Sequence, residues 1–243
     1  MPPLALVTGS AHRLGKAFAL SLARQGYALL LHYHNTESEA HQTADEIRAL
    51  GVPVHLAQAD LTQPNGIQSL ISNLDTLLHD FQNSTFNLLV NSAAVMQRSD
   101  IDTLSLDDWD STFALNLRAP FALSKALSKK MTQGGLIVNV TDVGAQKTWS
   151  GYPAYTVSKS ALESLTRVLA RALAPKIRVN AIAPGLILHS DVVSTEQWEK
   201  LVSRLPLKRA ATLNEVTSAL EFLIKNEYIT GQTIVVDGGY SLI

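Results

Sequence analysis

Short apolar runs alternate with longer segments of helical periodicity along the whole chain. Each run ends at a glycine, a proline or a polar residue, and a short continuous apolar run is typical of a strand buried on both faces of a parallel sheet. We expect seven such strands, at residues 4–7, 27–33, 52–57, 86–90, 136–140, 177–182 and 233–236.

In the segments between these strands, apolar residues recur three and four positions apart, which is the spacing of one helical face packed on a sheet. We expect helices at residues 14–25, 42–50, 67–81, 106–131, 153–174, 191–205 and 213–224. The fourth helix should kink at Pro120, because proline has no N–H to donate. Strands and helices that alternate from end to end favour the α/β class, so we expect residues 1–243 to form one doubly wound domain with a parallel sheet of about seven strands.

Composition and charge exclude several classes of protein. The chain has 243 residues, of which 46% are hydrophobic, enough for one sizeable core. A net charge of −1 with scattered basic residues gives no nucleic-acid or membrane surface, and the apolar run at the N-terminus is too short for a signal peptide. The chain has no cysteine and its seven histidines are scattered, so we expect no disulfide and no metal site, and a cytoplasmic location.

Polar residues and glycines follow most of the predicted strands. In a parallel sheet, ligands collect at the carboxyl ends of the strands, so these residues should converge on one edge. They are Thr8, Gly9, His34, Asp60, Asn91, Thr141, Asp142, Pro184 and Gly185.

The turn after the first strand contains Gly9 and Gly15, with Arg13 at a place that often holds glycine. A strand, a glycine turn and a helix in this order form the first half of a dinucleotide-binding unit of the Rossmann type. Gly9 would let the backbone approach a pyrophosphate, and the helix that opens near Gly15 would point its positive end at that group.

The end of the second strand favours NADP over NAD. An acidic residue here usually accepts hydrogen bonds from the ribose 2′-hydroxyl, but this chain has Tyr33, His34, Asn35 and Thr36. A carboxylate would repel a 2′-phosphate, whereas Arg13 and nearby hydroxyl and amide groups would attract it. The alternative is an ordinary polar loop with a solvated Arg13.

Tyr155 and Lys159 would project from one face of the fifth predicted helix, one turn apart. An ammonium beside a phenol favours the phenolate, so we expect Lys159 to lower the pKa of Tyr155 from about 10 toward neutrality. Tyr155 would then be a proton donor at physiological pH.

The ordered motifs T-G-x-x-x-R-x-G, Asp60-Leu61, Asn116, Tyr155-x-x-x-Lys159 and Pro184-Gly185 resemble the short-chain dehydrogenase/reductase family over nearly the whole chain. The resemblance implies that Tyr155 donates the proton, that Lys159 lowers its pKa and holds the nicotinamide ribose, and that Asn116 supports a proton-relay water. The resemblance also implies a set of cofactor-binding residues. They are Gly9, Arg13, Leu14, Gly15, Tyr33, His34, Asn35, Thr36, Asp60, Leu61, Asn91, Ala93, Thr141, Tyr155, Lys159, Pro184, Gly185 and Ile187.

Asp142 stands where that family has a serine that orients the substrate carbonyl, thirteen residues before the tyrosine. An ionised Asp only accepts hydrogen bonds and would repel a developing alkoxide, so Asp142 suggests an imine rather than a ketone as the acceptor. The alternative is that Asp142 merely caps the loop after the fifth strand.

Arg13, the HYH sequence ending at His34, Asp142 and the final YITGQTIVVDGGYSL are similar to the pteridine reductase and dihydromonapterin reductase branch. This similarity implies NADPH-dependent reduction of a small dihydropterin, with Tyr155 and Asp142 relaying the proton. It also implies a homotetramer built on the helices at 106–131 and 155–174.

Three positions depart from that branch: Met96 replaces a stacking aromatic residue, Asn35 replaces an arginine, and Ile187 replaces a serine. Trp149 could supply the missing surface, so we expect Met96, Asp142, Trp149 and Tyr155 to bind the substrate. Two alternatives stay open: a carbonyl or 3-oxoacyl thioester reductase, and a catalytically silent NADP sensor.

Overall fold

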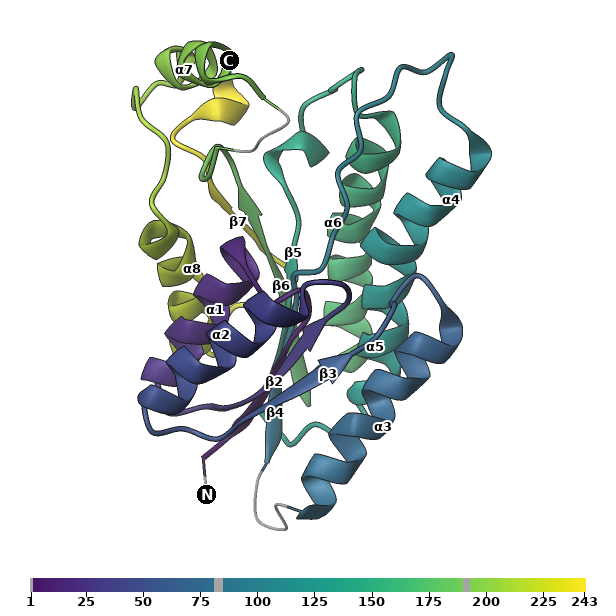
Figure 1. Ribbon diagram of the computed structural model, residues 1–243, viewed down its shortest axis with the longest axis vertical. Helices are drawn as coiled ribbons and strands as arrows, with labels where there is room; N and C mark the ends of the chain where they lie inside the picture. Colours follow the sequence, from purple (N-terminus) through teal and green to yellow (C-terminus); the bar gives the residue numbers. More distant parts are fainter. Residues whose placement is uncertain (1, 81–84, 190–192) are drawn as a thin grey trace.

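The computed structural model describes residues 2–80, 85–189 and 193–243, and its strands form one parallel sheet (Figure 1). The strand order is β3-β2-β1-β4-β5-β6-β7, and every neighbouring pair is parallel. The α/β class and the doubly wound sheet are therefore confirmed. The strands are β1 Leu4–Val7, β2 Ala28–Tyr33, β3 Val54–Gln58, β4 Phe86–Asn91, β5 Gly135–Val140, β6 Ile177–Pro184 and β7 Thr233–Val236.

Helices cover both faces of the sheet, with α1, α2 and α8 on one face and α3 to α6 on the other (Figure 1). Their bounds are α1 Arg13–Arg24, α2 Glu37–Ala49, α3 Pro64–Asp80, α4 Leu106–Phe113, α5 Ala119–Leu127, α6 Pro153–Leu173, α7 Thr195–Arg204 and α8 Leu213–Lys225. No helix in the described part of the chain is long and apolar enough to cross a membrane.

Successive residues of each buried strand point to opposite faces, and this alternation divides the core into two layers. In β1, Leu4 and Leu6 pack with α3, α5 and α6, whereas Ala5 and Val7 pack with α1, α2 and α8. Because both layers are apolar, the strands read as the continuous hydrophobic runs seen in the sequence.

The helix expected at 106–131 is interrupted by a widened turn directly before Pro120, the residue at which a kink is expected. A π-helix, Ala114–Arg118, separates α4 from α5, and the N–H of Ala119 bonds the carbonyl of Ala114, five residues back. Pro120 is the second residue of α5, which follows the π-helix without a break, and it has no N–H to donate to the turn before it. The irregularity therefore falls in the turn before the proline, and α5 ends at Leu127 rather than Met131.

The starts of two other helices, α2 and α7, differ from expectation. Helix α2 starts at Glu37 rather than residue 42, with two acidic residues in its first turn that favour a helix N-terminus. Helix α7 starts at Thr195, because the Ser194 side chain accepts a hydrogen bond from the N–H of Gln197 and caps it. The expected start of α7 at residue 191 and the expected end of α3 at Phe81 lie outside the described residues.

Candidate active site

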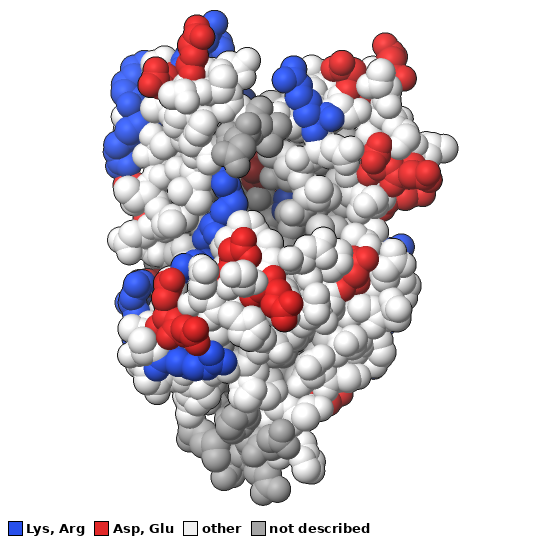
Figure 2. All heavy atoms as spheres, viewed as in Figure 1, with Lys and Arg blue, Asp and Glu red and all other residues white. Residues whose placement is uncertain are grey.

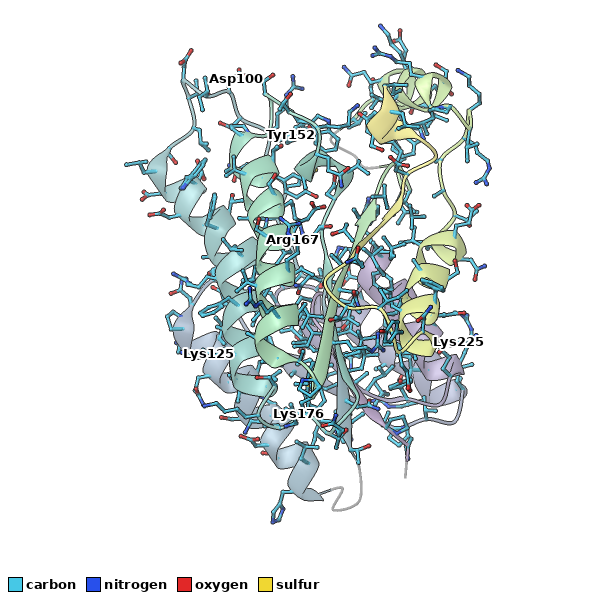
Figure 3. The ribbon with its side chains drawn as sticks, turned by 180° about the vertical axis from the view of Figure 1, so that it is seen from behind. Asp100, Lys125, Tyr152, Arg167, Lys176 and Lys225 are labelled. Atoms are coloured by element: carbon cyan, nitrogen blue, oxygen red, sulfur yellow. The ribbon has the colours of Figure 1, made fainter. Side chains whose placement is uncertain are left out.

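A cavity of about 1010 Å³ opens at the carboxyl edge of the sheet. In the space-filling view the surface is hollowed there, and basic side chains lie beside the opening (Figure 2). From behind, Tyr152 stands at this edge, just before α6, and Lys176, just past the end of α6, stands at the opposite edge (Figure 3). The cavity is where a doubly wound sheet binds its ligands.

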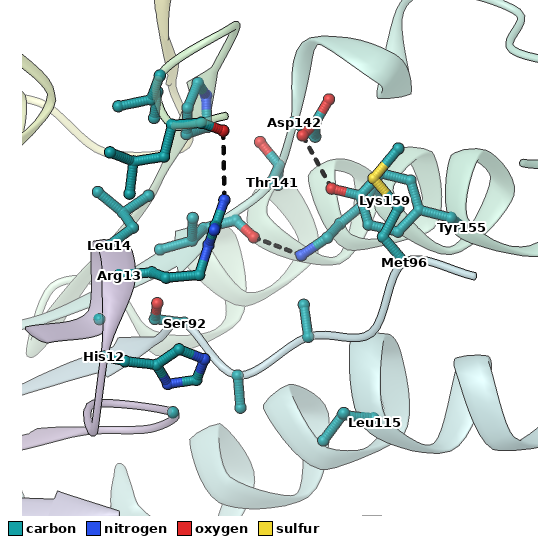
Figure 4. A pocket seen from close by; sticks show the side chains of 18 of the residues that line it. His12, Arg13, Leu14, Ser92, Met96, Leu115, Thr141, Asp142, Tyr155 and Lys159 are labelled. Carbon is teal, nitrogen blue, oxygen red and sulfur yellow. Dashed lines mark hydrogen bonds between the residues drawn. The ribbon is translucent and has the colours of Figure 1, made fainter. Parts of the chain in front are cut away.

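Three side chains meet at the inner end of this cavity (Figure 4). Asp142 follows β5, while Tyr155 and Lys159 lie one turn apart on α6, which Pro153 opens at a position that proline favours. The Tyr155 hydroxyl donates to Asp142 Oδ2 at 2.8 Å. Lys159 Nζ donates to the carbonyl oxygen of Val140 at 2.7 Å.

The other oxygen of Asp142 has a structural partner. Oδ1 accepts a hydrogen bond from the N–H of Gly144 at 2.7 Å and caps the short 3₁₀ turn Val143–Ala145. The capping role that the sequence left open is therefore present together with the contact to Tyr155. One carboxylate oxygen fixes the position of the side chain and the other faces the phenol.

The electrostatics of the three groups differ from the expected ones. Burial, the Asp142 charge and the hydrogen bond to Asp142 raise the pKa of Tyr155 well above its usual value. The expected lowering by Lys159 is therefore wrong for this arrangement, because a phenol that donates to a carboxylate holds its proton more tightly. Burial lowers the pKa of Lys159 to about 8, although the Asp142 charge opposes the shift.

The pKa of Asp142 is also raised above its usual value. Burial raises its pKa, and the hydrogen bonds from Gly144 and Tyr155 and the charge of Lys159 reverse only part of that shift. A carboxyl group with a raised pKa can hold a proton nearer to neutral pH than an ordinary Asp. The pair of Asp142 and Tyr155 can therefore hold and pass on a proton.

The glycine turn after β1 is tightly packed. Gly9 has a φ of +64°, and a Cβ there would lie 2.8 Å from the Cα of Ala93. A Cβ on Gly15 would lie 2.0 Å from the carbonyl oxygen of Gly9, so α1 packs directly on the turn. The turn can close only without these side chains, and it brings the N-terminus of α1 to the cavity.

Arg13 occupies a left-handed position with a φ of +51°, which glycine would adopt at lower cost. Its guanidinium reaches across the cavity and donates to the carbonyl oxygens of Leu188 at 3.3 Å and His189 at 3.4 Å. Figure 4 shows one of these two bonds. Arg13 thus connects the glycine turn with the segment after β6.

Past β2, the cavity wall is the polar stretch at residues 33–36, in which Tyr33 is buried while His34 and Asn35 are exposed. Asp60, after β3, supplies a carboxylate nearby, and its Oδ1 accepts hydrogen bonds from the amide and hydroxyl of Thr62. Burial acts to raise the pKa of Asp60, but these bonds outweigh it and lower the pKa.

All the predicted cofactor and substrate residues line the cavity except Asn91, and of the four predicted catalytic residues only Asn116 is absent from its described lining. Asn91 turns into the core and donates to Asn139 Oδ1 at 2.8 Å. Asn116, in the π-helix, accepts from the N–H of Val95 and donates to its carbonyl, both at 2.9 Å, and also donates to Ser158. The predicted roles of both in binding and catalysis stay predictions.

Trp149 packs against the 3₁₀ turn that Asp142 caps. A Cβ on Gly144 would lie 2.8 Å from the Trp149 ring, so the indole covers the backbone that holds Asp142. Its ring centroid lies 6.3 Å from that of Tyr152 and 6.0 Å from that of Tyr240. The three aromatic rings therefore form a wall of the cavity that also contains Asp142 and Tyr155.

Sequence reasoning missed several residues that line the cavity. They include His12, His32, Tyr152, Trp198 and Tyr240. His32 could have been found from the sequence, because it is the one polar residue in the otherwise apolar run that forms β2, at residues 28–33. Trp198 and Tyr240 come from α7 and from a short turn after β7, and no local pattern connects them with the site.

Comparison with known proteins identifies the family. The sequence profile of the family described as enoyl-(acyl carrier protein) reductase matches residues 9–241. The 3-oxoacyl-[acyl-carrier-protein] reductase FabG of Staphylococcus aureus (strain Mu50) is 31% identical over 246 residues, which cover 98% of this chain and 98% of that relative.

Two solved structures of FolM, alternative dihydrofolate reductase 1, both with NADP, have closely similar folds. The Brucella canis protein has a TM-score of 0.92 and 37% identity, covering 99% of this chain and 94% of the other. The Brucella suis protein has a TM-score of 0.91 and 38% identity, covering 100% and 96%. Since the profile and these relatives match nearly the whole chain, the protein belongs to the short-chain dehydrogenase/reductase family.

Proposed function

We propose that the protein is an NADPH-dependent reductase of a dihydropterin-type C=N bond. The observation that carries this proposal is the hydrogen bond of 2.8 Å between Tyr155 and the partly buried Asp142, whose pKa is raised. The two FolM structures, 37% and 38% identical to this chain, support a pteridine-like substrate.

The cavity fits NADP by the chemistry of its walls. The first N–H groups of α1 have no partner within the helix, and together with the helix dipole they favour a pyrophosphate at the glycine turn. Residues 33–36 carry no carboxylate against a 2′-phosphate, and Arg13 supplies a cation nearby. Lys159 would hold the nicotinamide ribose, and bound NADPH would supply the hydride.

The proton would come from the chain's own residues. Tyr155 gives its proton to the substrate nitrogen next to the carbon that is reduced, and a protonated Asp142 restores the proton to Tyr155. Gly144 keeps the carboxyl group in place during this transfer. In the ionised form of Asp142, a ketone would develop negative charge on oxygen beside a carboxylate, which would repel that charge.

A second candidate is a 3-oxoacyl thioester reductase, because the FabG relative carries that activity in its name and is 31% identical. Oxidation of NADPH with dihydrobiopterin and with an acetoacetyl thioester separates the two functions. We expect faster turnover of the dihydropterin, and a clear preference for the thioester would contradict the proposal. No turnover across a broad panel despite tight NADPH binding would favour the silent sensor.

The substitution Asp142→Ser tests the role of the acid directly. Since general acid catalysis contributes about 10²–10⁴-fold, we expect kcat for the dihydropterin to fall by about 100-fold or more. The Kd for NADPH should stay within about threefold, which serves as the internal control for an intact cofactor site. Undiminished pterin turnover in this variant would contradict the proposal.

We also propose a homotetramer in which α4, α5 and α6 form the contacts between subunits. Apolar side chains on these helices are exposed, namely Phe121, Val157 and Val168, with exposed fractions of 44%, 45% and 63%. Exposed apolar groups gathered on one set of helices are typical of a protein interface.

A further inference from the structure

His32 is a buried histidine near the end of β2, and its side chain is 2% exposed. The N–H of Gly9 donates to its Nδ1 at 3.1 Å. A nitrogen that accepts carries no proton, so the proton of the neutral ring is on Nε2. Nε2 lies 2.9 Å from the carbonyl oxygen of Ala59 and donates to it.

The sheet order explains why one ring reaches both partners. Strand β2 lies between β1 and β3, so its last residues stand between the turns that follow those two strands. Gly9 belongs to the glycine turn after β1, and Ala59 directly precedes Asp60 after β3. Both Gly9 and Asp60 line the cavity.

Backbone bonds strengthen the same connection. The N–H and the hydroxyl of Ser10 donate to the carbonyl oxygen of His32 at 3.0 and 3.2 Å. The N–H of Ala59 donates to the carbonyl oxygen of Tyr33 at 3.0 Å. His32 therefore fixes two successive N–H groups of the glycine turn, one through its ring and one through its backbone.

The ring stays neutral over the physiological range. Burial lowers the pKa of His32 to about 4; the hydrogen bond to Ala59 opposes this shift, His34 adds to it and Asp60 opposes it. A protonated Nδ1 would face the N–H of Gly9 and lose that bond. The neutral ring with its proton on Nε2 is the form that holds both turns.

We propose that His32 is a positioning residue for the dinucleotide, holding the glycine turn and the Ala59-Asp60 segment in the arrangement that binds the adenosine and pyrophosphate half. It acts through Gly9, Ser10 and Ala59, whose geometry decides how closely the cofactor can approach. Because the inference rests on the proposed function, the test must separate loss of positioning from absence of NADPH binding.

Three variants and one matched control test the assignment. His32→Leu removes both side-chain bonds, His32→Asn keeps an acceptor near the place of Nδ1, and His32→Gln keeps a donor near that of Nε2. The control is Asn180→Leu, since the buried Asn180 also accepts from one backbone N–H, of Gln232 at 3.0 Å, and donates to one carbonyl, of Ile229 at 2.9 Å. Asn180 lies inside β6, on the other side of the sheet from β2, and both of its partners lie in the segment before β7.

We expect His32→Leu to raise the Kd for NADPH by about tenfold or more, since a buried N–H left without a partner weakens the site by about that factor. The KM for NADPH should rise with it, while kcat changes less. Hydrogen exchange at residues 8–14 should become faster. His32→Gln should weaken NADPH binding more than His32→Asn, and Asn180→Leu should change neither the Kd nor exchange in that segment.

An equal Kd for wild type, His32→Leu and Asn180→Leu, with unchanged exchange at residues 8–14, would overturn the positioning role and leave the proposed function intact. If His32→Leu does not fold, the order of His32→Asn and His32→Gln decides, and equal affinities overturn the role. If the wild-type protein binds no NADPH, the proposed function fails and the inference fails with it.

Discussion

At the scale of single residues, the chemistry depends on how Asp142 divides its two oxygens. One accepts from the backbone of Gly144 and the other from Tyr155, so the same carboxyl group is structural and reactive. The raised pKa values of both Asp142 and Tyr155 have one main cause, which is burial. A serine at this position could donate to a ketone, whereas the acid favours delivery of a proton to nitrogen.

The lowered pKa of Lys159 predicts a specific dependence of stability on pH. The folded protein releases the proton near pH 8, while an unfolded lysine keeps it to about pH 10.4. Between these values the unfolded state binds more protons, so this group makes the protein more stable as pH rises. The Tm of the wild type should therefore rise relative to that of Lys159→Met between about pH 8 and pH 10.

Lys125→Met is the matched control, because it removes an exposed lysine on α5 (Figure 3). Its Tm difference from the wild type should stay constant over the same pH range. A constant difference for Lys159→Met as well would show that Lys159 keeps its proton in the folded protein.

At the scale of elements, the π-helix between α4 and α5 places Asn116 where it supports the cavity wall from behind. Its side chain satisfies both backbone groups of Val95, and Met96, the next residue, lines the cavity. A widened helical turn is frequent at functional sites, because it turns a side chain out of the regular helical pattern. The wall at Met96 therefore depends on a residue that does not itself line the cavity.

Asn116→Ala should destabilise the protein by about 1–3 kcal/mol, because the N–H and carbonyl of Val95 lose their partners. The KM for the substrate should rise as the Met96 segment shifts. Thermal unfolding and steady-state kinetics measure both effects. Ser158→Ala removes the third bond of Asn116 and the bond from the Ser158 hydroxyl to the Tyr155 carbonyl, but it keeps both bonds to Val95, so it should have a smaller effect on both. A fall in kcat alone would favour the proton-relay role that the family resemblance implies.

At the scale of the whole molecule, the cavity and the proposed subunit contacts share a helix. Tyr155 and Lys159 lie on the buried side of α6, and Val157 and Val168 are exposed on the same helix. A partner subunit packed on α6 would restrict motion of the helix that carries the catalytic pair. Assembly and catalysis would then be coupled through α6.

Val168→Glu should break the proposed tetramer into smaller species, because it places a charge in an apolar contact. Light scattering coupled to size-exclusion chromatography measures the mass. Phe222→Glu is the control, since Phe222 is 46% exposed on α8, on the other face of the sheet. A monomeric wild type, or equal masses for wild type and Val168→Glu, would contradict the proposed interface.

The sequence by itself determined the order of strands and helices, the carboxyl edge as the site, and the pairing of Tyr155 with Lys159. These features follow from local causes: continuous apolar runs form buried strands, and a spacing of four places two side chains on one helical face. The early start of α2 was also visible in principle, since Thr36 and Glu39 have the spacing of a helix N-terminus.

Only the tertiary structure decided which groups meet in the cavity and in which protonation state. It turned Asn91 and Asn116 away from the cavity and brought Trp198 and Tyr240 to it from distant segments. It also reversed the expected pKa shift of Tyr155, because that shift depends on burial and on which partner accepts the proton of the phenol. Distances and burial arise when the sheet and helices pack together, and no local pattern along the chain encodes them.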